Sequence, residues 1–202
     1  MERWLGNLRQ LDLWLFLHGN TVWVRPWADA VFLWLTAPPH RVLLLAGLWL
    51  LLFAFGGRKG RIAAVVLLVA VALSDQLCNR WIKVWADRVR PCFVIPETRL
   101  LLPHQARSPS FPSSHAMNTF AAAMVLFEVG PLLGWTGLAV AALVSWSRVY
   151  VGVHYPSDVL AGAVFGVLVG LAIVRLERRL LQSAWAKRRF SRGKSEDSSR
   201  SP

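Results

Sequence analysis

The sequence predicts an all-α protein, built as a polytopic membrane helical bundle. Of its 202 residues, 55% are hydrophobic and 17% are charged, a more apolar balance than that of a soluble domain. The apolar residues gather in several long runs, each close to the ~20 residues that cross a bilayer as a helix. The length fits one domain. Together these features predict five to six transmembrane helices.

The first 37 residues are aromatic and apolar, but charged and polar side chains interrupt them repeatedly. Leu5, Leu8, Leu11 and Leu15 recur at helical spacing, which predicts an amphipathic helix at the membrane surface. We therefore expect residues 1–37 to form an interfacial or partly inserted segment, and to add a sixth helix if the segment crosses. The scattered charges and the lack of a small-residue cleavage site are unlike a cleaved signal peptide.

Five apolar runs follow and are the predicted membrane spans. The dipeptide Gly130-Pro131 separates the third run from the fourth, because these residues end one helix and start another. The five predicted spans are residues 40–57, 61–82, 115–130, 132–153 and 157–176.

The net charge of +12 comes in large part from the C-terminal end of the chain. Residues 175–202 carry nine Lys or Arg and three acidic residues. A basic flank directly after an apolar span is typical of the cytoplasmic face, near anionic lipid. The tail therefore indicates a membrane bilayer, and no nucleic acid, as the partner. Residues 185–202 are basic and rich in serine, which predicts a disordered tail.

The positive-inside rule also orients the predicted spans. The basic turn Arg58–Arg61 and the C-terminal tail are separated by an even number of spans, so both are expected on the cytoplasmic side. The connection 83–114, rich in Arg and Pro, and the turn 153–157 then share the outer face. A connection as long as 83–114 is usually functional or disordered.

Three clusters of polar residues fall at the outer ends of the spans. They are Lys83 with Arg90-Pro91, Pro112-Ser113-Ser114-His115, and Ser147-Arg148 with His154 and Asp158. The parity of the spans places all three clusters on one side of the membrane, whichever way the protein is inserted. Ionisable residues at membrane level are costly, so a group of them at one face predicts a functional site.

The cations of these clusters indicate an anion site. Lys83, Arg90 and Arg148 have few acidic neighbours in the sequence. Three converging cations suit a group with two or more negative charges, such as a phosphate monoester or a pyrophosphate. Backbone N–H groups near Ser113 and Ser114, at the start of a span, would add donors to the anion. Such donors stabilise a phosphoryl group during transfer.

Two histidines are the candidate catalytic groups. His154 and Asp158 are four residues apart, which places them on one face of a helical turn. A carboxylate bonded to one ring nitrogen fixes the tautomer and leaves the other nitrogen able to attack, so His154 is the candidate nucleophile. His115 opens a predicted helix and suits the general acid that protonates the leaving oxygen and then activates water.

The spacing of the clusters resembles the three-part signature of the type 2 phosphatidic acid phosphatase (PAP2) superfamily. The segments Ser74-Asp75-Gln76 and 110–116 are most similar to the small bacterial undecaprenyl-pyrophosphate phosphatases. Ser114 departs from the family pattern, which usually has Gly there, but a backbone donor survives the change. The matching motifs are Lys83-x6-Arg90-Pro91, Pro112-Ser113-Ser114-His115 and Ser147-Arg148-x5-His154-x3-Asp158.

The resemblance implies a PAP2/haloperoxidase-like catalytic core within residues 38–184 and metal-independent hydrolysis without a cofactor. It implies that a polyprenyl (undecaprenyl) pyrophosphate is cleaved to the monophosphate through a phosphohistidine. This reaction is expected at the outer face of a bacterial inner membrane, with the C-terminal tail in the cytoplasm. The same chemistry on phosphatidylglycerophosphate, phosphatidate or lipid A, or phosphotransfer to an acceptor lipid, stays open.

Other interpretations of these residues are weaker. A metal site at His154 and Asp158 is disfavoured because cations surround the pair. A non-catalytic binder or transporter of anionic lipid would need the cations but not the ordered histidines. Asp75, inside a predicted span, either has a functional role or holds the bundle together. No role is assigned to His18, His40 and His104, and Cys78 and Cys92 are either two free thiols or a bridge.

Overall fold

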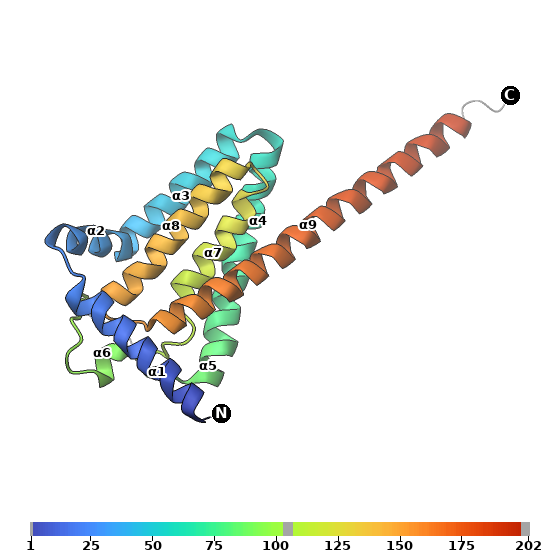
Figure 1. Ribbon diagram of the computed structural model, residues 1–202. Coiled ribbons are helices and arrows are strands. Elements are labelled where there is room, and N and C mark those ends of the chain that lie inside the picture. Colours follow the sequence, from blue (N-terminus) through green and yellow to red (C-terminus); the bar gives the residue numbers. More distant parts are fainter. Residues whose placement is uncertain (1, 103–106, 199–202) are drawn as a thin grey trace.

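The computed structural model describes residues 2–102 and 107–198, and this part of the chain is helical without any strand (Figure 1). The predicted all-α class is confirmed. Two short π-helical turns, η1 (His18–Val22) and η2 (Leu77–Ile82), follow α1 and α4. The α-helices are α1 (Glu2–Leu17), α2 (Pro26–Thr36), α3 (Pro38–Phe55), α4 (Gly57–Gln76), α5 (Lys83–Ala86), α6 (Pro91–Val94), α7 (Ser114–Leu126), α8 (Pro131–Tyr150) and α9 (Pro156–Ser198).

Helix α7 lies inside the bundle and packs against α4, α8 and α9 (Figure 1). Helices α7 and α9 approach closely because three glycines of α9 face the α7 backbone. Gly162, Gly166 and Gly170 recur every four residues along α9, and a Cβ atom at Gly166 would overlap the carbonyl oxygen of Met117. Such a stripe of small residues lets two membrane helices approach closely. The buried alanines of α7 are Ala116, Ala121, Ala122 and Ala123.

Three helices of the described chain are long and apolar enough to cross a membrane. They are the stretch Gly57–Val94, which contains α4, η2, α5 and α6, then α8, and Pro156–Ser183 within α9. The apolar part of α3, Val42–Phe55, is shorter, and α7 has only 13 residues. The predicted span 115–130 is too long because its last residues form the turn before α8.

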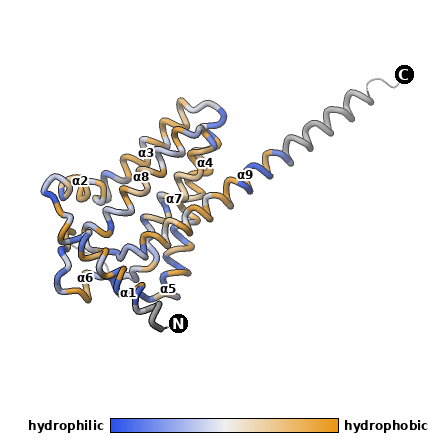
Figure 2. The backbone as a smooth tube through the Cα atoms, viewed as in Figure 1, coloured by the Kyte–Doolittle hydropathy of each residue, from blue (hydrophilic) through white to orange (hydrophobic). Residues whose placement is uncertain are grey.

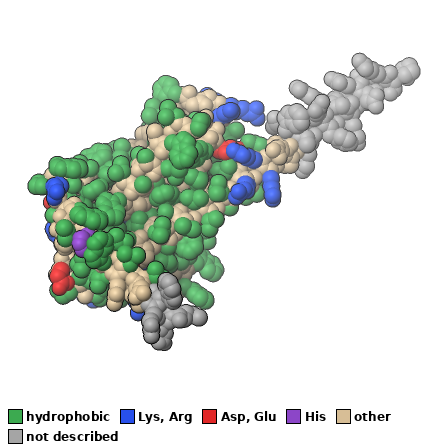
Figure 3. Space-filling view, viewed as in Figure 1, with side chains coloured by type: hydrophobic (Ala, Val, Ile, Leu, Met, Phe, Trp, Pro, Cys, Tyr) green, Lys and Arg blue, Asp and Glu red, His purple; other side chains and the backbone are tan. Residues whose placement is uncertain are grey.

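The outer surface of the bundle is apolar, as a membrane protein requires. Figure 2 shows hydrophobic residues along α3, α4, α8 and the first half of α9. Figure 3 shows large hydrophobic side chains over the same face, with Lys and Arg gathered where α4 begins and where α9 leaves the bundle. A soluble monomer rarely exposes so large an apolar surface. The protein is therefore a multi-pass membrane protein.

The N-terminal segment forms helices outside the central bundle. Helix α1 lies across the end of the bundle that carries α5 and α6 (Figure 1). Neither α1 nor α2 is among the described helices that qualify as spans. The fully buried side chain of Asn20 donates to the carbonyl oxygens of Arg99 at 2.9 Å and Tyr150 at 2.7 Å. These bonds join the segment to the outer connection and to α8.

The C-terminal end differs from the expected disordered tail. Helix α9 continues to Ser198, whereas disorder was expected from residue 185. Residues 181–192 contain no Gly or Pro and are rich in Ala, Leu, Lys and Arg, which favour helix. Residues 199–202 lie outside the described part, as do residues 103–106, which include His104.

The structure also decides between the alternatives for the two cysteines and for Asp75. Cys78 and Cys92 are free thiols. The Oδ1 atom of Asp75 accepts hydrogen bonds from Asn79 at 2.9 Å and from Asn118 at 3.0 Å. The second bond joins α4 to α7, which supports the interpretation that Asp75 holds the bundle together.

We predict that the α7–α9 contact tolerates no added side chain. Gly166→Ala should lower the free energy of unfolding by about 1–3 kcal/mol, because its Cβ atom would overlap the α7 backbone. Gly47→Ala on α3 is the matched control, since no atom lies within 4 Å of the position that its Cβ atom would take. Unfolding in detergent micelles measures both variants. Equal stability of Gly166→Ala and wild type would contradict the packing described here.

Candidate active site

The structure brings the three predicted clusters together at the end of the bundle near α5 and α6. The Nζ atom of Lys83, at the start of α5, donates to the Ser114 Oγ atom at 3.1 Å. The Nη1 atom of Arg90, just before α6, lies 3.1 Å from the His154 Nε2 atom. These contacts connect the first cluster to both of the others. The parity of the predicted spans therefore placed the three clusters correctly at one end of the bundle.

His154 lies in the turn between α8 and α9, so the expectation that it shares a helix face with Asp158 is wrong. Pro156 begins α9, and the backbone N–H of His154 instead donates to the carbonyl oxygen of Arg148 at 3.2 Å. Asp158 lies in the first turn of α9 and folds back, where its Oδ2 atom accepts from the backbone N–H of Tyr155 at 2.9 Å. This is the bond that an acidic residue makes in a capping box. It turns the carboxylate towards the imidazole.

The contacts of the His154 ring define its tautomer. A guanidinium group can only donate, so Nε2 accepts the hydrogen bond from Arg90 and keeps its lone pair. The proton of the neutral ring is therefore assigned to Nδ1. That atom lies 3.5 Å from the Oδ2 atom of Asp158, which is looser than an ordinary hydrogen bond. A small rotation of the ring would close this contact.

The surroundings of His154 keep its imidazole neutral. The side chain is 1% exposed. Burial lowers the pKa of His154 well below its ordinary value, and the positive charges of Arg90, Arg148 and Lys83 lower this pKa further. The influence of all three cations on one ring places them in the neighbourhood of His154. A ring that stays neutral near pH 7 has the lone pair that a nucleophile needs.

Each of the three cations is buried, with 4–5% of its surface exposed. The guanidinium group of Arg90 is held by the outer connection. Its Nε atom donates to the Ser108 carbonyl oxygen at 2.8 Å, and its Nη1 atom donates to the Val153 carbonyl oxygen at 3.1 Å. Arg90 therefore links the loop to the turn that carries His154. Buried, oriented cations of this kind bind phosphate oxygens more strongly than cations in water do.

The N-terminus of α7 completes the site. Ser113 is the N-cap residue, and its backbone N–H donates to the carbonyl oxygen of Asp158 at 3.0 Å, so the starts of α7 and α9 touch. The first N–H groups of a helix are an anion-binding feature. His115 and Ser114 follow in the first turn of α7 and line a cavity of about 250 Å³. The apolar walls of this cavity come from α2, α3, α4, α7 and α8.

Two charged residues behind Asp158, Arg88 and Asp12, were not predicted from the sequence as parts of the site. The Nη1 atom of Arg88 donates to the Asp158 Oδ1 atom at 2.6 Å. The Nη2 atom of Arg88 donates to the Asp12 Oδ2 atom on α1 at 2.7 Å. Arg88 lies inside the first motif and was visible as a cation there. Asp12 carries no signal in the sequence, because the contact with Arg88 joins residues 76 positions apart.

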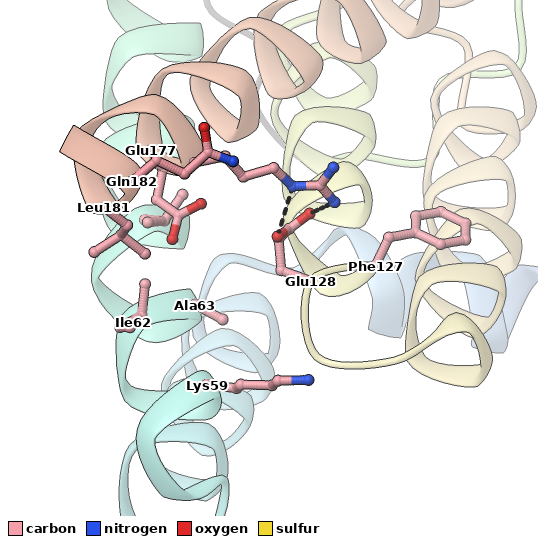
Figure 4. A pocket seen from close by; sticks show the side chains of 10 residues that line it. Lys59, Ile62, Ala63, Phe127, Glu128, Glu177, Leu181 and Gln182 are labelled. Carbon is pink, nitrogen blue, oxygen red and sulfur yellow. Dashed lines mark hydrogen bonds and ion pairs between the residues drawn. The ribbon is translucent and has the colours of Figure 1, made fainter. Parts of the chain in front are cut away.

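Neither a metal site nor a second catalytic cluster is evident in the part of the chain that the structure describes. Among the residues whose side chains the structure describes, no three His, Cys, Asp or Glu residues form a group that could hold a metal ion. A cavity of about 440 Å³ lies at the opposite end of the bundle, between α4 and α9 (Figure 4). Arg178 and Glu128 form a two-bond ion pair in its wall, at 2.6 and 3.1 Å. None of the predicted site residues lines it.

Comparison with known proteins agrees with the geometry. The model of the PAP2 superfamily matches residues 63–181. An undecaprenyl-diphosphatase from Sulfolobus acidocaldarius is 33% identical over 129 residues, which cover 63% of this chain and 60% of that protein. The undecaprenyl-diphosphatase BcrC of Bacillus subtilis is 29% identical over 160 residues, covering 78% and 77%. The chain spans only 56% and 60% of the first curated relatives that it matches.

A solved structure has the same fold. It is a transmembrane PAP2 type phosphatidylglycerolphosphate phosphatase from Bacillus subtilis, with a TM-score of 0.68 and 24% identity, covering 86% of this chain and 87% of that chain. The family model covers more than half of the chain and contains all three clusters. The protein therefore belongs to the PAP2 superfamily.

Proposed function

We propose that the protein is a membrane lipid phosphatase that hydrolyses a polyprenyl pyrophosphate, such as undecaprenyl pyrophosphate, to the monophosphate. The observation that supports this most directly is the buried imidazole of His154, whose Nε2 atom accepts a hydrogen bond from Arg90 and whose pKa is lowered by burial and by Arg90, Arg148 and Lys83. A binding protein needs the cations but has no use for a nucleophile held among them. The names of the two undecaprenyl-diphosphatase relatives favour this substrate over other lipids.

In the first step, the terminal phosphate takes the hydrogen bonds of the cations. Arg90 exchanges its bond to His154 for a phosphate oxygen, which frees the lone pair of Nε2. This atom attacks phosphorus, so a P–N bond forms as the bond to the leaving lipid phosphate breaks. The ring becomes positively charged, and the carboxylate of Asp158 stabilises the Nδ1–H as the 3.5 Å contact shortens. Lys83 and Arg148 balance the charge on the phosphoryl oxygens.

His115 serves the leaving group and then water. It gives a proton to the oxygen that departs with the lipid monophosphate, then takes a proton from the water that attacks the phosphohistidine. Cleavage of the P–N bond releases inorganic phosphate and restores neutral His154. The leaving group carries the polyprenyl chain, so the chain belongs on the His115 side. The apolar cavity that begins at His115 and Ser114 fits the first units of this chain.

The proposal includes the orientation of the protein. The candidate site lies at the end of the bundle near α5, and the Lys and Arg side chains at the starts of α4 and the exit of α9 gather at the other end (Figure 3). The positive-inside rule then assigns the basic end to the cytoplasm. The active site would face the outer side of a bacterial inner membrane.

Other phosphorylated lipids fit the same chemistry, and a substrate panel separates them. The panel compares undecaprenyl pyrophosphate, phosphatidylglycerophosphate, phosphatidate and lipid A in detergent micelles, with release of inorganic phosphate as the readout. We expect the largest kcat/KM for undecaprenyl pyrophosphate. A larger value for another lipid would reassign the substrate, and a phosphorylated acceptor lipid in place of free phosphate would indicate a transferase. Release from none of these lipids by folded protein would overturn the phosphatase proposal.

Removal of the nucleophile should abolish turnover. His154→Ala is expected to lower kcat by at least about 10³-fold, because the variant lacks the ring nitrogen that is proposed to attack phosphorus. Wild-type protein quenched in base after incubation with phosphorus-labelled substrate should carry an acid-labile phosphohistidine that His154→Ala lacks. His18→Ala is the matched control, since the His18 imidazole hydrogen-bonds to the Trp14 carbonyl oxygen at 2.8 Å, outside the candidate site. A wild-type rate in folded His154→Ala would refute the mechanism.

The lowered pKa of His154 predicts activity in acid. An ordinary histidine is half protonated at about pH 6.5, and protonation would remove the lone pair. Because the pKa of His154 is lowered, its ring should stay neutral at pH 6.5 and titrate only below it. NMR of ring-labelled histidine in micelles, assigned with His154→Ala, measures this midpoint. Arg90→Gln removes one positive charge and should move the midpoint to higher pH; a wild-type midpoint above 6.5 would contradict the prediction.

A further inference from the structure

A chain of ion pairs leads from the candidate active site to α1. Arg88 bridges two carboxylates, with Nη1 on the Oδ1 atom of Asp158 at 2.6 Å and Nη2 on the Oδ2 atom of Asp12 at 2.7 Å. The Asp158 side chain is fully buried, and that of Asp12 is 11% exposed. Asp12 belongs to α1 and Asp158 to α9. A single guanidinium group therefore connects the two helices directly behind His154.

Ser157 closes the network on a second side. The Asp12 Oδ1 atom accepts from the backbone N–H of Ser157 at 2.8 Å, and the Oδ2 atom accepts from the Ser157 hydroxyl at 2.5 Å. The Nη1 atom of Arg88 also donates to the Ser157 hydroxyl, at 2.7 Å. Asp12 thus supplies the carboxylate that the N-terminus of α9 favours, although it comes from another helix. It holds the residue immediately before Asp158.

The network decides how Asp158 faces the ring. A buried carboxylate stays ionised only when it is paired and hydrogen-bonded. Arg88 occupies the Oδ1 atom of Asp158, which leaves the Oδ2 atom for the Tyr155 N–H and for the Nδ1 side of His154. The guanidinium group also stacks on the Tyr155 ring, 3.9 Å from its centroid. Asp12 binds the Nη2 atom of Arg88. It therefore also fixes the orientation of the Nη1 atom, which binds Asp158.

Apolar side chains help to hold helix α1 in this position. It exposes the apolar side chains of Leu8, Leu11 and Trp14, which suit the membrane surface. Phe16, on the inner side, is fully buried and lies 5.5 Å from the Tyr155 ring centre. Asp12 is a charged residue of α1 that turns inward to an ion pair. The helix therefore presents apolar residues to the bilayer and one carboxylate to the site.

We propose that Asp12, acting through Arg88 and Ser157, is a positioning residue for His154. The placement of α1 across the end of the bundle is then part of active-site alignment. This inference rests on the proposed phosphatase function. It goes beyond that function because it assigns a role to a helix outside the family match at residues 63–181.

The test uses the full-length protein in micelles with four variants. Asp12→Asn keeps the shape of the side chain and removes its charge, and Arg88→Met keeps length and removes the guanidinium group. The double variant completes a cycle. Asp29→Asn is the matched control, because Asp29 also joins an N-terminal helix to a loop arginine, with two bonds to Arg99 at 2.9 and 3.0 Å. That pair has no hydrogen bond to a residue proposed for catalysis.

The expected pattern separates positioning from folding. Asp12→Asn should lower kcat about 10- to 100-fold and leave KM within about threefold, because the loss misaligns the imidazole of His154 without removing a substrate contact. Arg88→Met should cost at least as much. The double variant should lose less than the product of the two single losses, since Asp12 acts in part through Arg88 and in part through Ser157. Asp29→Asn should keep kcat within about threefold even if its thermal midpoint falls as far as that of Asp12→Asn.

Several results would overturn the inference. A wild-type kcat in Asp12→Asn would refute a positioning role, and so would a change confined to KM. Additive losses in the double variant would show that Asp12 does not act through Arg88. An equal fall of kcat in Asp29→Asn would indicate a general tether of the N-terminal segment. Wild-type protein that is inactive on every lipid of the panel would instead refute the proposed function, so the two failures are distinguishable.

Discussion

The structure depends on one electrostatic requirement: a neutral imidazole has to lie among buried cations, with an ionised carboxylate behind it. Lys83, Arg90 and Arg148 lower the pKa of His154 and keep its lone pair. The same burial would neutralise Asp158 if nothing paired with it. Arg88 supplies that pairing charge at 2.6 Å. In the proposed mechanism, anion binding, activation of the nucleophile and orientation of the carboxylate therefore constrain one another.

The packing of the helical bundle meets this requirement because it brings the first turns of α7 and α9 together. Gly162, Gly166 and Gly170 let α9 approach the small residues of α7. The close contact places the first turns of both helices side by side, with the Ser113 N–H bonded to the Asp158 carbonyl oxygen at 3.0 Å. The first N–H groups of α7 and the turn before α9, which carries His154, then lie beside the same site. Loss of the glycine stripe would therefore disturb the site as well as the fold.

Much of the site could be predicted from the sequence, because its position depends on the order of the spans and its chemistry on the residue types at their ends. The order of apolar runs placed Lys83, His115 and Arg148 at one end, and the structure brings these clusters together. The relation of His154 to Asp158 was predicted for the wrong reason. Helical spacing was assumed, whereas Pro156 starts α9 after the histidine and a backfolded carboxylate makes the approach. Helical spacing alone cannot predict this turn, because its geometry depends on the hydrogen bond from the His154 N–H to the Arg148 carbonyl oxygen.

The sequence by itself determined the all-α membrane class, the family resemblance and the chemical type of the site, because hydrophobic runs and motif spacing are local properties of the chain. Only the tertiary structure decided that Asp12 meets Arg88 and Ser157, that α9 continues to Ser198, and that α7 is shorter than its predicted span. The Asp12 contacts join residues 76 and 145 positions apart. Pairings at such separations depend on how the helices pack, and no local pattern in the sequence encodes them.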